Sequence, residues 1–333
     1  MSIWTTENKT LPTIIERDLG GNNLDTFKYS SDNKRYHTLH YYNMQKYGER
    51  VYKAPIDAGF SCPNIDGTKG VNGCIYCDGG SGYFTDNSCI AVSKQLEHQI
   101  SLIHQKHPNA KINAYFQSYS NTYAPVEVLK ERFEPVLDFP DVVAVSIATR
   151  PDCLPDDVMD YLKDFATRTN LTVEIGLQSI NDETAEIIGR GHTADEFIKA
   201  LEKLKAAGIR SVVHIINGLP GEDEKMMLET AYRLGKMKPD GVKIHLLHII
   251  KNTELERLYY MQQYIPMTME DYIDVTVKQL EYIPAETVIE RLTCDGDKSK
   301  LVAPLWSADK IAVLGAIDKL QVQLDSYQGK KCK

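Results

Sequence analysis

Three cysteines, Cys62, Cys74 and Cys77, stand close together in one glycine-rich stretch, GFSCPNIDGTKGVNGCIYCD. The Cys74/Cys77 pair alone is compatible with zinc, a redox dithiol or an iron–sulfur cluster. Three thiolates discriminate better, because a closed structural zinc site uses four ligands, whereas a catalytic [4Fe-4S] cluster uses three and leaves one iron open. We therefore expect these three cysteines to bind an open [4Fe-4S] cluster.

A fourth cysteine, Cys89, provides a rival interpretation, because it completes a formal set of four with regular spacing. Four ligands would suit structural zinc or a fully ligated electron-transfer cluster. Cys89 leads through Ile90 and Val92 into a helical pattern, however, and a lone cysteine beside apolar residues is usually a small core hydrophobe. We leave Cys89 out of the ligand set, and a zinc-stabilised, non-catalytic binding module remains an alternative.

Length and composition describe a chain that can bury one large core. It has 333 residues, of which 25% are charged, and a formal net charge of −8. No apolar run approaches the roughly 20 residues that a bilayer crossing needs, and the first residues lack the order of a signal peptide. Seven cysteines without a disulfide framework suit a reducing compartment. We therefore expect a cytoplasmic protein without a membrane partner.

Short apolar runs alternate with helical patterns along most of the chain, which is typical of parallel strands joined by crossover helices. Runs such as VVAVSI are almost continuously apolar, as in strands covered on both faces. We predict an α/β fold, a partial (β/α)6 barrel with an open side. Its six strands are predicted at Val51–Asp57, Ile112–Gln117, Val142–Ala148, Leu171–Gly176, Ser211–Ile216 and Val242–Ile249.

Helix signals lie between these strands. Thr193 and Glu196 fit a capping box, and Phe197, Leu201 and Leu204 form an apolar stripe behind them. Further helices are predicted at Thr38–Tyr47, Ser93–Lys106, Val126–Leu137, Asp156–Thr167 and Asp223–Met237.

We divide the chain into three segments: an N-terminal leader at 1–34, a core barrel at 35–265 and a short α+β extension at 266–333 packed on the barrel. The extension is expected to contain a helix at Met269–Tyr282, a strand at Thr287–Arg291 and a helix at Asp309–Leu324.

Basic and aromatic residues gather between Lys28 and Lys53, where six lysines and arginines are interleaved with six tyrosines. This composition suits phosphates and stacked bases. It suits equally well an amphipathic helix whose tyrosines pack on the barrel. The net negative charge argues against general binding of polyanions, so any contact with nucleic acid has to be local.

The widened cysteine loop resembles the radical S-adenosylmethionine (SAM) superfamily, and in particular the bacterial YhcC/YtqA group (MnmL-like), which is related to the radical SAM domain of the Elongator catalytic subunit. The usual spacing of that superfamily is Cys-x3-Cys-x2-Cys, whereas eleven residues separate the first two cysteines here. Members of the group tend to have glycine where this chain has Cys294, so we assign no ligand role to Cys294. Five later motifs agree in order and position: TRPD, VEIGLQS, RGHT, NGLPGE and NTELE.

The resemblance implies a set of contacts to SAM at the carboxyl ends of the strands. Tyr76 is expected against the adenine, and polar groups after the second strand are expected around the amino group. Glu174 is favoured as a ligand contact, and Arg190 could offer a planar fork to the carboxylate of SAM. The full set of expected contacts is Tyr76, Gln117, Ser118, Ser120, Thr149, Glu174, Gln178 and Arg190.

Lys243, His245 and His248 fall on the last predicted strand of the barrel. The alternation of a strand sends Lys243 and His245 to one face and His248 to the other. One of these sets could face the substrate. No residue is assigned as catalytic.

The chemistry implied is reductive cleavage of SAM to methionine and a 5′-deoxyadenosyl radical, with a flavodoxin- or ferredoxin-type electron donor. The resemblance to the Elongator branch implies tRNA as substrate, and the YtqA side implies conversion of wobble 5-carboxymethylaminomethyluridine to 5-aminomethyluridine. Elongator subunits add an acetyltransferase domain, and only about fifty residues follow Tyr282. Acetyl transfer is therefore not expected. A radical SAM enzyme acting on a small metabolite or peptide remains an alternative.

Overall fold

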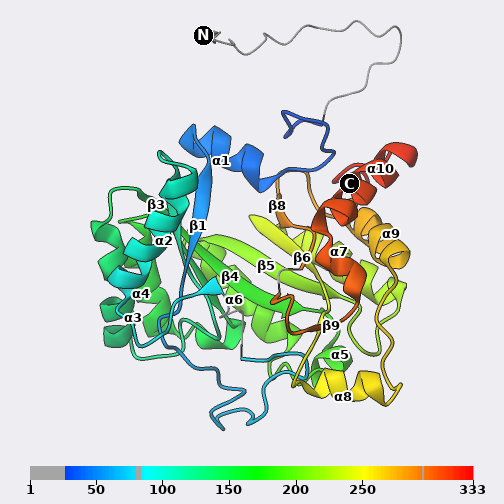
Figure 1. Ribbon diagram of the computed structural model, residues 1–333, viewed down its shortest axis with the longest axis horizontal. Coiled ribbons are helices and arrows are strands. Elements are labelled where there is room, and N and C mark those ends of the chain that lie inside the picture. Colours follow the sequence, from blue (N-terminus) through cyan, green and yellow to red (C-terminus); the bar gives the residue numbers. More distant parts are fainter. Residues whose placement is uncertain (1–26, 80–83, 295, 333) are drawn as a thin grey trace, which may run out of the picture.

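A curved sheet of parallel strands organises the molecule (Figure 1). The computed structural model describes residues 27–79, 84–294 and 296–332. The seven strands of this sheet are β1 (Val51–Ile56), β2 (Lys111–Phe116), β3 (Val142–Thr149), β4 (Leu171–Gln178), β5 (Arg210–Asn217), β6 (Gly241–Leu246) and β8 (Val288–Arg291). They lie in that order, each parallel to its neighbours. Among the described strands β1 and β8 are the two edges, so the barrel is not closed.

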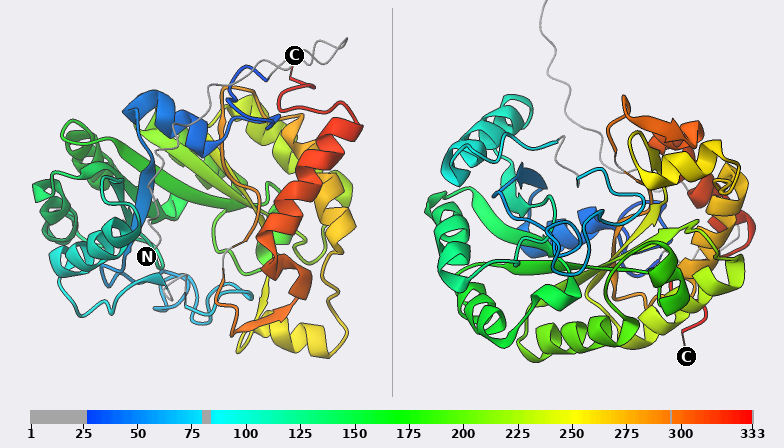
Figure 2. Two further views of the ribbon diagram at one scale, coloured as in Figure 1. Left: turned by 45° about the horizontal axis from the view of Figure 1, so that its top comes forward. Right: turned by 90° about the horizontal axis from the view of Figure 1, so that it is seen from below.

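Helices cover the convex side of the sheet, as the right-hand view in Figure 2 shows. The α-helices of the described residues are α1 (Leu39–Tyr47), α2 (Val92–Lys106), α3 (Val126–Phe133), α4 (Asp156–Ala166), α5 (Asp182–Ile187), α6 (Ala194–Ala206), α7 (Glu224–Met237), α8 (Glu254–Tyr260), α9 (Met269–Leu280) and α10 (Lys310–Gln323). Short 3-10 turns occur at η2 (Glu134–Asp138), η3 (Pro151–Cys153) and η4 (Leu305–Ala308). A small antiparallel pair, β7 (Ile249–Ile250) and β9 (Leu301–Ala303), lies beside the main sheet.

Local sequence explains most of these elements. The capping box predicted at Thr193 and Glu196 is present, with both reciprocal hydrogen bonds formed. The stripe on α6 is buried: Phe197, Leu201 and Leu204 are at most 2% exposed and belong to the main hydrophobic core. Burial of such a stripe, rather than helix propensity, is the main source of stability of a surface helix.

The partial barrel predicted from the sequence is confirmed, with one strand more than the six expected. The strand predicted at Thr287–Arg291 joins the main sheet as β8, parallel to β6. Helix α9 is the crossover between them, so the segment from β6 to β8 repeats the strand–helix–strand unit of the barrel. The proposed division at residue 265 stays a prediction.

The sixth predicted strand is wrong at its end. The chain leaves the main sheet after Leu246 and forms β7 with different partners. Period-two alternation therefore stops before His248. This break decides where the two histidines of the segment lie, as described below.

Helix α1 lies where the strands begin, above β1 in Figure 1, and we call this side of the sheet its amino-terminal edge. The cysteine loop lies at the opposite, carboxyl-terminal edge, where the strands end. Most cations of the basic segment are engaged within the protein: Lys28 with Glu286, Lys34 with Asp318, Arg35 with Asp325, and Lys53 with Glu174 and Glu290. These pairs support the interpretation in which the segment packs on the barrel. The first 26 residues of the predicted leader lie outside the described residues.

Candidate active site

The three cysteines lie in one loop at the carboxyl end of β1, where parallel α/β sheets bind their ligands. Cys62, Cys74 and Cys77 are all half-buried. Burial, and after it the charge of Cys77, raises the pKa of Cys74 to about 11. Cys89 is exposed in the turn before α2, so the expectation that it is a core residue is wrong.

Within the described residues, no three histidine, cysteine, aspartate or glutamate side chains converge as they would around a single metal ion. A [4Fe-4S] cluster does not require such convergence, because each thiolate binds a different iron. The cysteines nevertheless share electrostatic partners: Cys74 and Cys77 interact with each other, and Tyr119 interacts with both Cys62 and Cys77.

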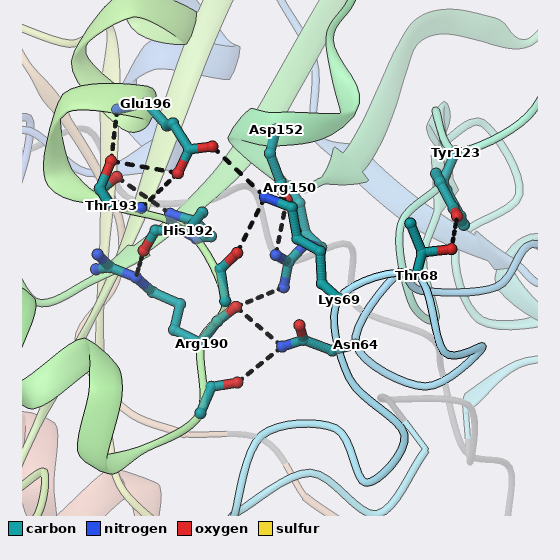
Figure 3. A network of polar contacts seen from close by, with 12 residues as sticks. Asn64, Thr68, Lys69, Tyr123, Arg150, Asp152, Arg190, His192, Thr193 and Glu196 are labelled. Atoms are coloured by element: carbon teal, nitrogen blue, oxygen red, sulfur yellow. Dashed lines mark hydrogen bonds and ion pairs between the residues drawn. The ribbon is translucent and has the colours of Figure 1, made fainter.

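A single amide fastens the cysteine loop to the loop after α5 (Figure 3). The Nδ2 of Asn64 donates to the carbonyl oxygens of Gly189 and Arg190, at 2.8 and 2.9 Å, and lies 3.7 Å from the Sγ of Cys74. Gly191 makes room for this contact, since a Cβ there would stand 2.3 Å from the Asn64 side chain. Close packing against Asn64 thus explains why the RGHT motif has glycine at position 191.

Lys69 forms a second clamp on the widened part of the loop (Figure 3). Its ammonium group lies 2.7 Å from Asp152 and 3.4 Å from Glu196, and it donates to the carbonyl oxygen of Gly191. Arg150 forms a paired contact with the same Asp152 carboxylate and donates to the Arg190 carbonyl. The eleven residues between the first two cysteines therefore reach the TRPD and RGHT motifs and bind them together.

Polar residues predicted after the second strand lie beside this loop. The backbone N–H of Ser120 donates to the carbonyl of Ser61, next to Cys62. Ser118 and Tyr119 both adopt positive φ, 77° and 59°, a conformation that is uncommon for non-glycine residues and is often found at functional sites. Asn121 supports this turn by donating to the carbonyls of Ser118 and Ala148.

Buried oxygens at this edge that have no hydrogen-bond partner among the described residues include the Oγ atoms of Ser118 and Ser120, the Oδ1 of Asn121 and the Oε1 of Gln178. Gln178 also has positive φ, 58°, and its side chain folds back over Gly176, where a Cβ would stand 2.2 Å from its amide. Buried polar atoms are normally satisfied, so this edge suits a polar ligand. Gln117 is buried at the start of the same turn.

Glu174 does not occupy the position expected of a ligand contact. It lies inside β4, because that strand continues to Gln178, and its carboxylate is fully buried. Lys53, Tyr115 and His214 bond to it at 2.9, 2.9 and 2.8 Å, and Lys243 makes a further contact. Burial alone would raise the pKa of Glu174, but Lys243 and Lys53 hold it well below its usual range. Glu174 is the centre of an ion network in the barrel interior.

Arg190 is also held by the protein. It is 1% exposed, and its guanidinium donates to the carbonyl oxygens of Leu177, Ser179 and His192 and to the Asp182 carboxylate. These bonds occupy four of its five N–H groups. The geometry fits a positioning residue that joins the end of β4 to the RGHT loop, in place of the expected contact to the carboxylate of SAM.

Thr149 ends β3 and is buried, and its hydroxyl pairs with that of Thr122 at 2.6 Å. Tyr76 packs against an apolar cluster that includes Ile188 and Leu255, and it also lines the cavity next to the cysteines. Loop anchoring and contact with a ligand are therefore compatible for Tyr76.

A cavity of about 280 Å³ opens at this edge of the sheet. Tyr76 and Cys77 form one part of its lining, and His245, His248 and Cys294 form another. A larger hollow of about 830 Å³ lies at the opposite edge, and its lining contains none of the three cysteines of the loop. We take the smaller cavity as the candidate active site because it adjoins the predicted cluster ligands.

Comparison with known proteins identifies the family. The amino-acid sequence matches the Radical SAM superfamily over residues 67–234 and the Radical_SAM C-terminal domain over residues 239–321. This chain belongs to the radical SAM superfamily. Radical SAM enzymes use a [4Fe-4S] cluster and SAM, which agrees with three cysteines in one loop beside unpartnered polar atoms.

Individual relatives agree with this assignment. The chain is 46% identical to "Uncharacterized protein YtqA" of Bacillus subtilis over 91% of this chain and 95% of that protein. It is 37% identical to a tRNA uridine(34) acetyltransferase of Methanocaldococcus jannaschii over 40% of this chain and 25% of that protein.

The structure of Elp3 from the archaeon Methanocaldococcus infernus superposes with a TM-score of 0.66 and 19% identity. That superposition covers 84% of this chain and 64% of the Elp3 chain, and it supports the fold.

The described helices include none long and apolar enough to cross a membrane.

Several residues of the site were not singled out by sequence reasoning. Asn64, Lys69 and Asn121 lie in loops and act through contacts that are distant in sequence. Their only local signal is position, since each stands within a few residues of a predicted site residue. Buried Gln95 on α2, which binds both backbone groups of Asp57 before the cysteine loop, has no such signal.

Proposed function

We propose that this radical SAM enzyme modifies tRNA, and that it converts 5-carboxymethylaminomethyluridine at the wobble position to 5-aminomethyluridine. The observation that carries the proposal is the similarity to proteins named tRNA uridine(34) acetyltransferase, which spans 40% of this chain. Since the match covers only 25% of that relative, the acetyl transfer in its name is not carried over.

The volume of the cavity supports a substrate of which only a small part enters the site. A cavity of about 280 Å³ is just below the usual range for ligand pockets, and Tyr76 and Gln178 of its lining are expected to contact SAM, so it suits the side chain of a modified base rather than a whole nucleoside. The rest of a tRNA would have to lie outside, across the rim. Lys251, Lys298 and Lys300 lie there, and Lys251 donates to the carbonyl of Ser299 in the turn that carries the other two.

The side chain of the proposed substrate suits hydrogen abstraction. Its methylene carbon stands between an amine and a carboxylate, which together stabilise a carbon radical. When bound, the cluster and SAM supply the means of removing a hydrogen atom from such a carbon. Loss of one electron to a flavodoxin- or ferredoxin-type acceptor and of one proton to solvent then leaves an imine. Water adds to the imine carbon, the carbon–nitrogen bond breaks, and glyoxylate leaves the aminomethyl group on the base.

The chain's own residues would hold the cofactors and the substrate. Cys62, Cys74 and Cys77 would ligate the cluster. The turn containing Ser118 and Ser120 offers unpartnered hydroxyls to SAM at the same edge.

Nucleoside analysis of tRNA from a deletion strain tests the proposal. We expect 5-carboxymethylaminomethyluridine to accumulate at the expense of later products. Adding purified enzyme, SAM and a reductant to that tRNA under anaerobic conditions should reverse the accumulation and release glyoxylate. Unchanged wobble nucleosides in the deletion strain would contradict the proposal and favour a small metabolite or peptide as substrate.

A further inference from the structure

Two histidines, His245 and His248, line the active-site cavity together with Tyr76 and Cys77 of the cysteine loop. We call these two side chains the histidine wall. His245 lies on β6, and His248 follows in the segment that has left the sheet, so both rings line the cavity. Strand alternation predicted that they would lie on opposite faces. The break after Leu246 removes that alternation and brings both imidazoles to one site.

Both rings carry a nitrogen that needs a partner. The Nε2 atoms of His245 and His248 are buried and have no hydrogen-bond partner among the described residues. His248 is only 9% exposed. A buried ring nitrogen without a partner is costly, and in a cavity the missing partner is naturally a ligand group.

Cations near these rings favour an anion, and the one nearby carboxylate that raises the pKa of His245, Glu174, is already paired with Lys53 and Lys243. Arg291 and Lys310 both lower the pKa of Cys294, which lines the same cavity, although burial raises that pKa to about 11 overall. Arg291 acts in the same direction on His245 and Lys310 on His248. The acids of the lining have other partners: Asp78 pairs with Lys300 at 2.9 Å, and Asp297 accepts from Ser299.

The histidines themselves are neutral at physiological pH. Burial lowers the pKa of His248 to about 4, and burial, followed by His214 and Arg291, lowers that of His245 well below its usual range. A neutral imidazole protonated on Nε2 donates one hydrogen bond from that atom. Such a donor beside cationic groups suits an oxygen of a carboxylate.

We propose that His245 and His248 bind the carboxylate of the substrate side chain. The proposal rests on the proposed function and deepens it, because it names the feature by which the enzyme would select its substrate. The carboxylate would lie against the histidine wall, and the adjoining methylene would extend toward the part of the cavity lined by Tyr76 and Cys77. The aminomethyl product lacks a carboxylate, so it would bind weakly and leave.

Because residue 296 is a glycine, its backbone can lie close to the His248 ring. A Cβ at this position would stand 3.1 Å from the Nδ1 of His248, tighter than most contacts of real side chains. The loop that carries Gly296 therefore packs directly on the imidazole and limits its rotation. A ring held in this way is preorganised for one ligand geometry.

Binding of two nucleosides to the full-length, anaerobically reconstituted protein with SAM tests the proposal. The first probe is 5-carboxymethylaminomethyluridine, and the second, 5-methylaminomethyluridine, has the amine but no carboxylate. We expect the wild type to prefer the first. His248→Phe should weaken binding of the first probe by roughly 10- to 100-fold, as for a lost hydrogen bond to a charged group, and leave the second unchanged.

Three controls keep the result interpretable. His248→Gln retains an N–H donor near the position of Nε2, so it should restore most of the preference. His98→Phe changes an exposed histidine on α2 and should leave both affinities unchanged. Iron content and SAM affinity, measured for each variant, should match the wild type.

Equal loss of both probes in His248→Phe, or no preference for the carboxylate in the wild type, would overturn the inference. The proposed function fails separately: a histidine-dependent preference for the carboxylate together with no turnover of modified tRNA would preserve the carboxylate site and remove tRNA as the substrate.

Discussion

The side chain of Asn64 is a single group on which three parts of the site depend. Its amide nitrogen contacts two backbone carbonyls of the loop after α5 and approaches the sulfur of Cys74. An N–H directed at a cluster sulfur affects both the stability and the reduction potential of an iron–sulfur centre. We therefore expect Asn64 to link the position of the loop to the properties of the predicted cluster.

Two substitutions of Asn64 distinguish the loss of its hydrogen-bond donor, in Asn64→Ala, from the introduction of a negative charge, in Asn64→Asp. Asn64→Ala should reduce the retention of iron after anaerobic reconstitution, because the loop loses hydrogen bonds worth about 1–3 kcal/mol. Asn64→Asp should be worse, since it places a carboxylate against two carbonyl oxygens and a thiolate. Asn170 provides a matched control, because its amide bonds to a single carbonyl, that of Val143, away from the cysteine loop. Equal iron retention in Asn64→Asp and the wild type would contradict this role.

The Glu174 carboxylate is paired with two lysines inside the barrel. Its side chain is fully buried, and that of Lys243 is 3% exposed. Since its folded-state pKa lies below its unfolded one, the stabilisation is complete at neutral pH and is lost as the pH falls. We therefore predict a structural role for Glu174.

Glu174→Gln should destabilise the protein and leave SAM affinity intact. Removing one partner of a buried ion network strands the others and costs about 3–5 kcal/mol in the free energy of unfolding. Denaturant titration and equilibrium binding of SAM measure the two properties. The control is Glu254→Gln, which removes an exposed pair with Arg257 and should change stability by no more than about 1 kcal/mol. Lost SAM affinity with unchanged stability would restore Glu174 as a ligand contact.

The cysteine loop is the element that combines the predicted cluster ligands with the clamps that hold them. Lys69 and Asn64 tie it to segments that follow β3 and α5. Lys69 stands seven residues after Cys62, so a three-residue spacing between the first two cysteines would not contain it. The widened loop is thus part of the architecture of the site.

Serine substitution of single cysteines tests which ones hold the cluster. We expect close to four irons per chain in the wild type and loss of the cluster in Cys62→Ser, Cys74→Ser and Cys77→Ser. Cys89→Ser should retain it, because Cys89 is exposed in the turn before α2. Iron and sulfide analysis under anaerobic conditions gives the answer. Loss of metal in Cys89→Ser, or stoichiometric zinc in the native protein, would contradict the open-cluster assignment.

On the scale of the whole molecule, two opposite edges of the sheet carry different groups (Figure 1). The amino-terminal edge carries α1 and the basic, tyrosine-rich segment. The carboxyl-terminal edge carries the cysteine loop, the cavity and Lys251. If a tRNA base enters the cavity, phosphates near it should lie against the second edge.

Lysine-to-alanine changes at the two edges distinguish these surfaces. Lys251→Ala and Lys298→Ala at the cavity rim should weaken tRNA binding, and each should lower the slope of log affinity against log salt by roughly one. Lys46→Ala on α1 is the control at the opposite edge and should leave the slope unchanged. Binding measured over a range of salt concentrations tests this. A larger effect from Lys46 would move the tRNA to the amino-terminal edge.

The sequence alone identified the features that are encoded locally. Strand runs, the capping box at Thr193 and the barrel class depend on neighbours within a few residues, so periodicity and composition were sufficient. The family followed from the cysteine loop and the order of motifs, and the comparisons confirm it. The assignment of Cys62, Cys74 and Cys77 as ligands stays a prediction from the same local pattern.

Only the tertiary structure decided how polar residues at the strand ends are used. Glu174 pairs with Lys53 and Lys243, 121 and 69 residues away, and no local pattern reveals such partners. Arg190 is bonded largely to backbone carbonyls, which have no sequence signal. His248 reaches the cavity because β6 ends early. Each outcome depends on long-range packing, since burial and pairing are properties of the folded chain and composition alone does not specify them.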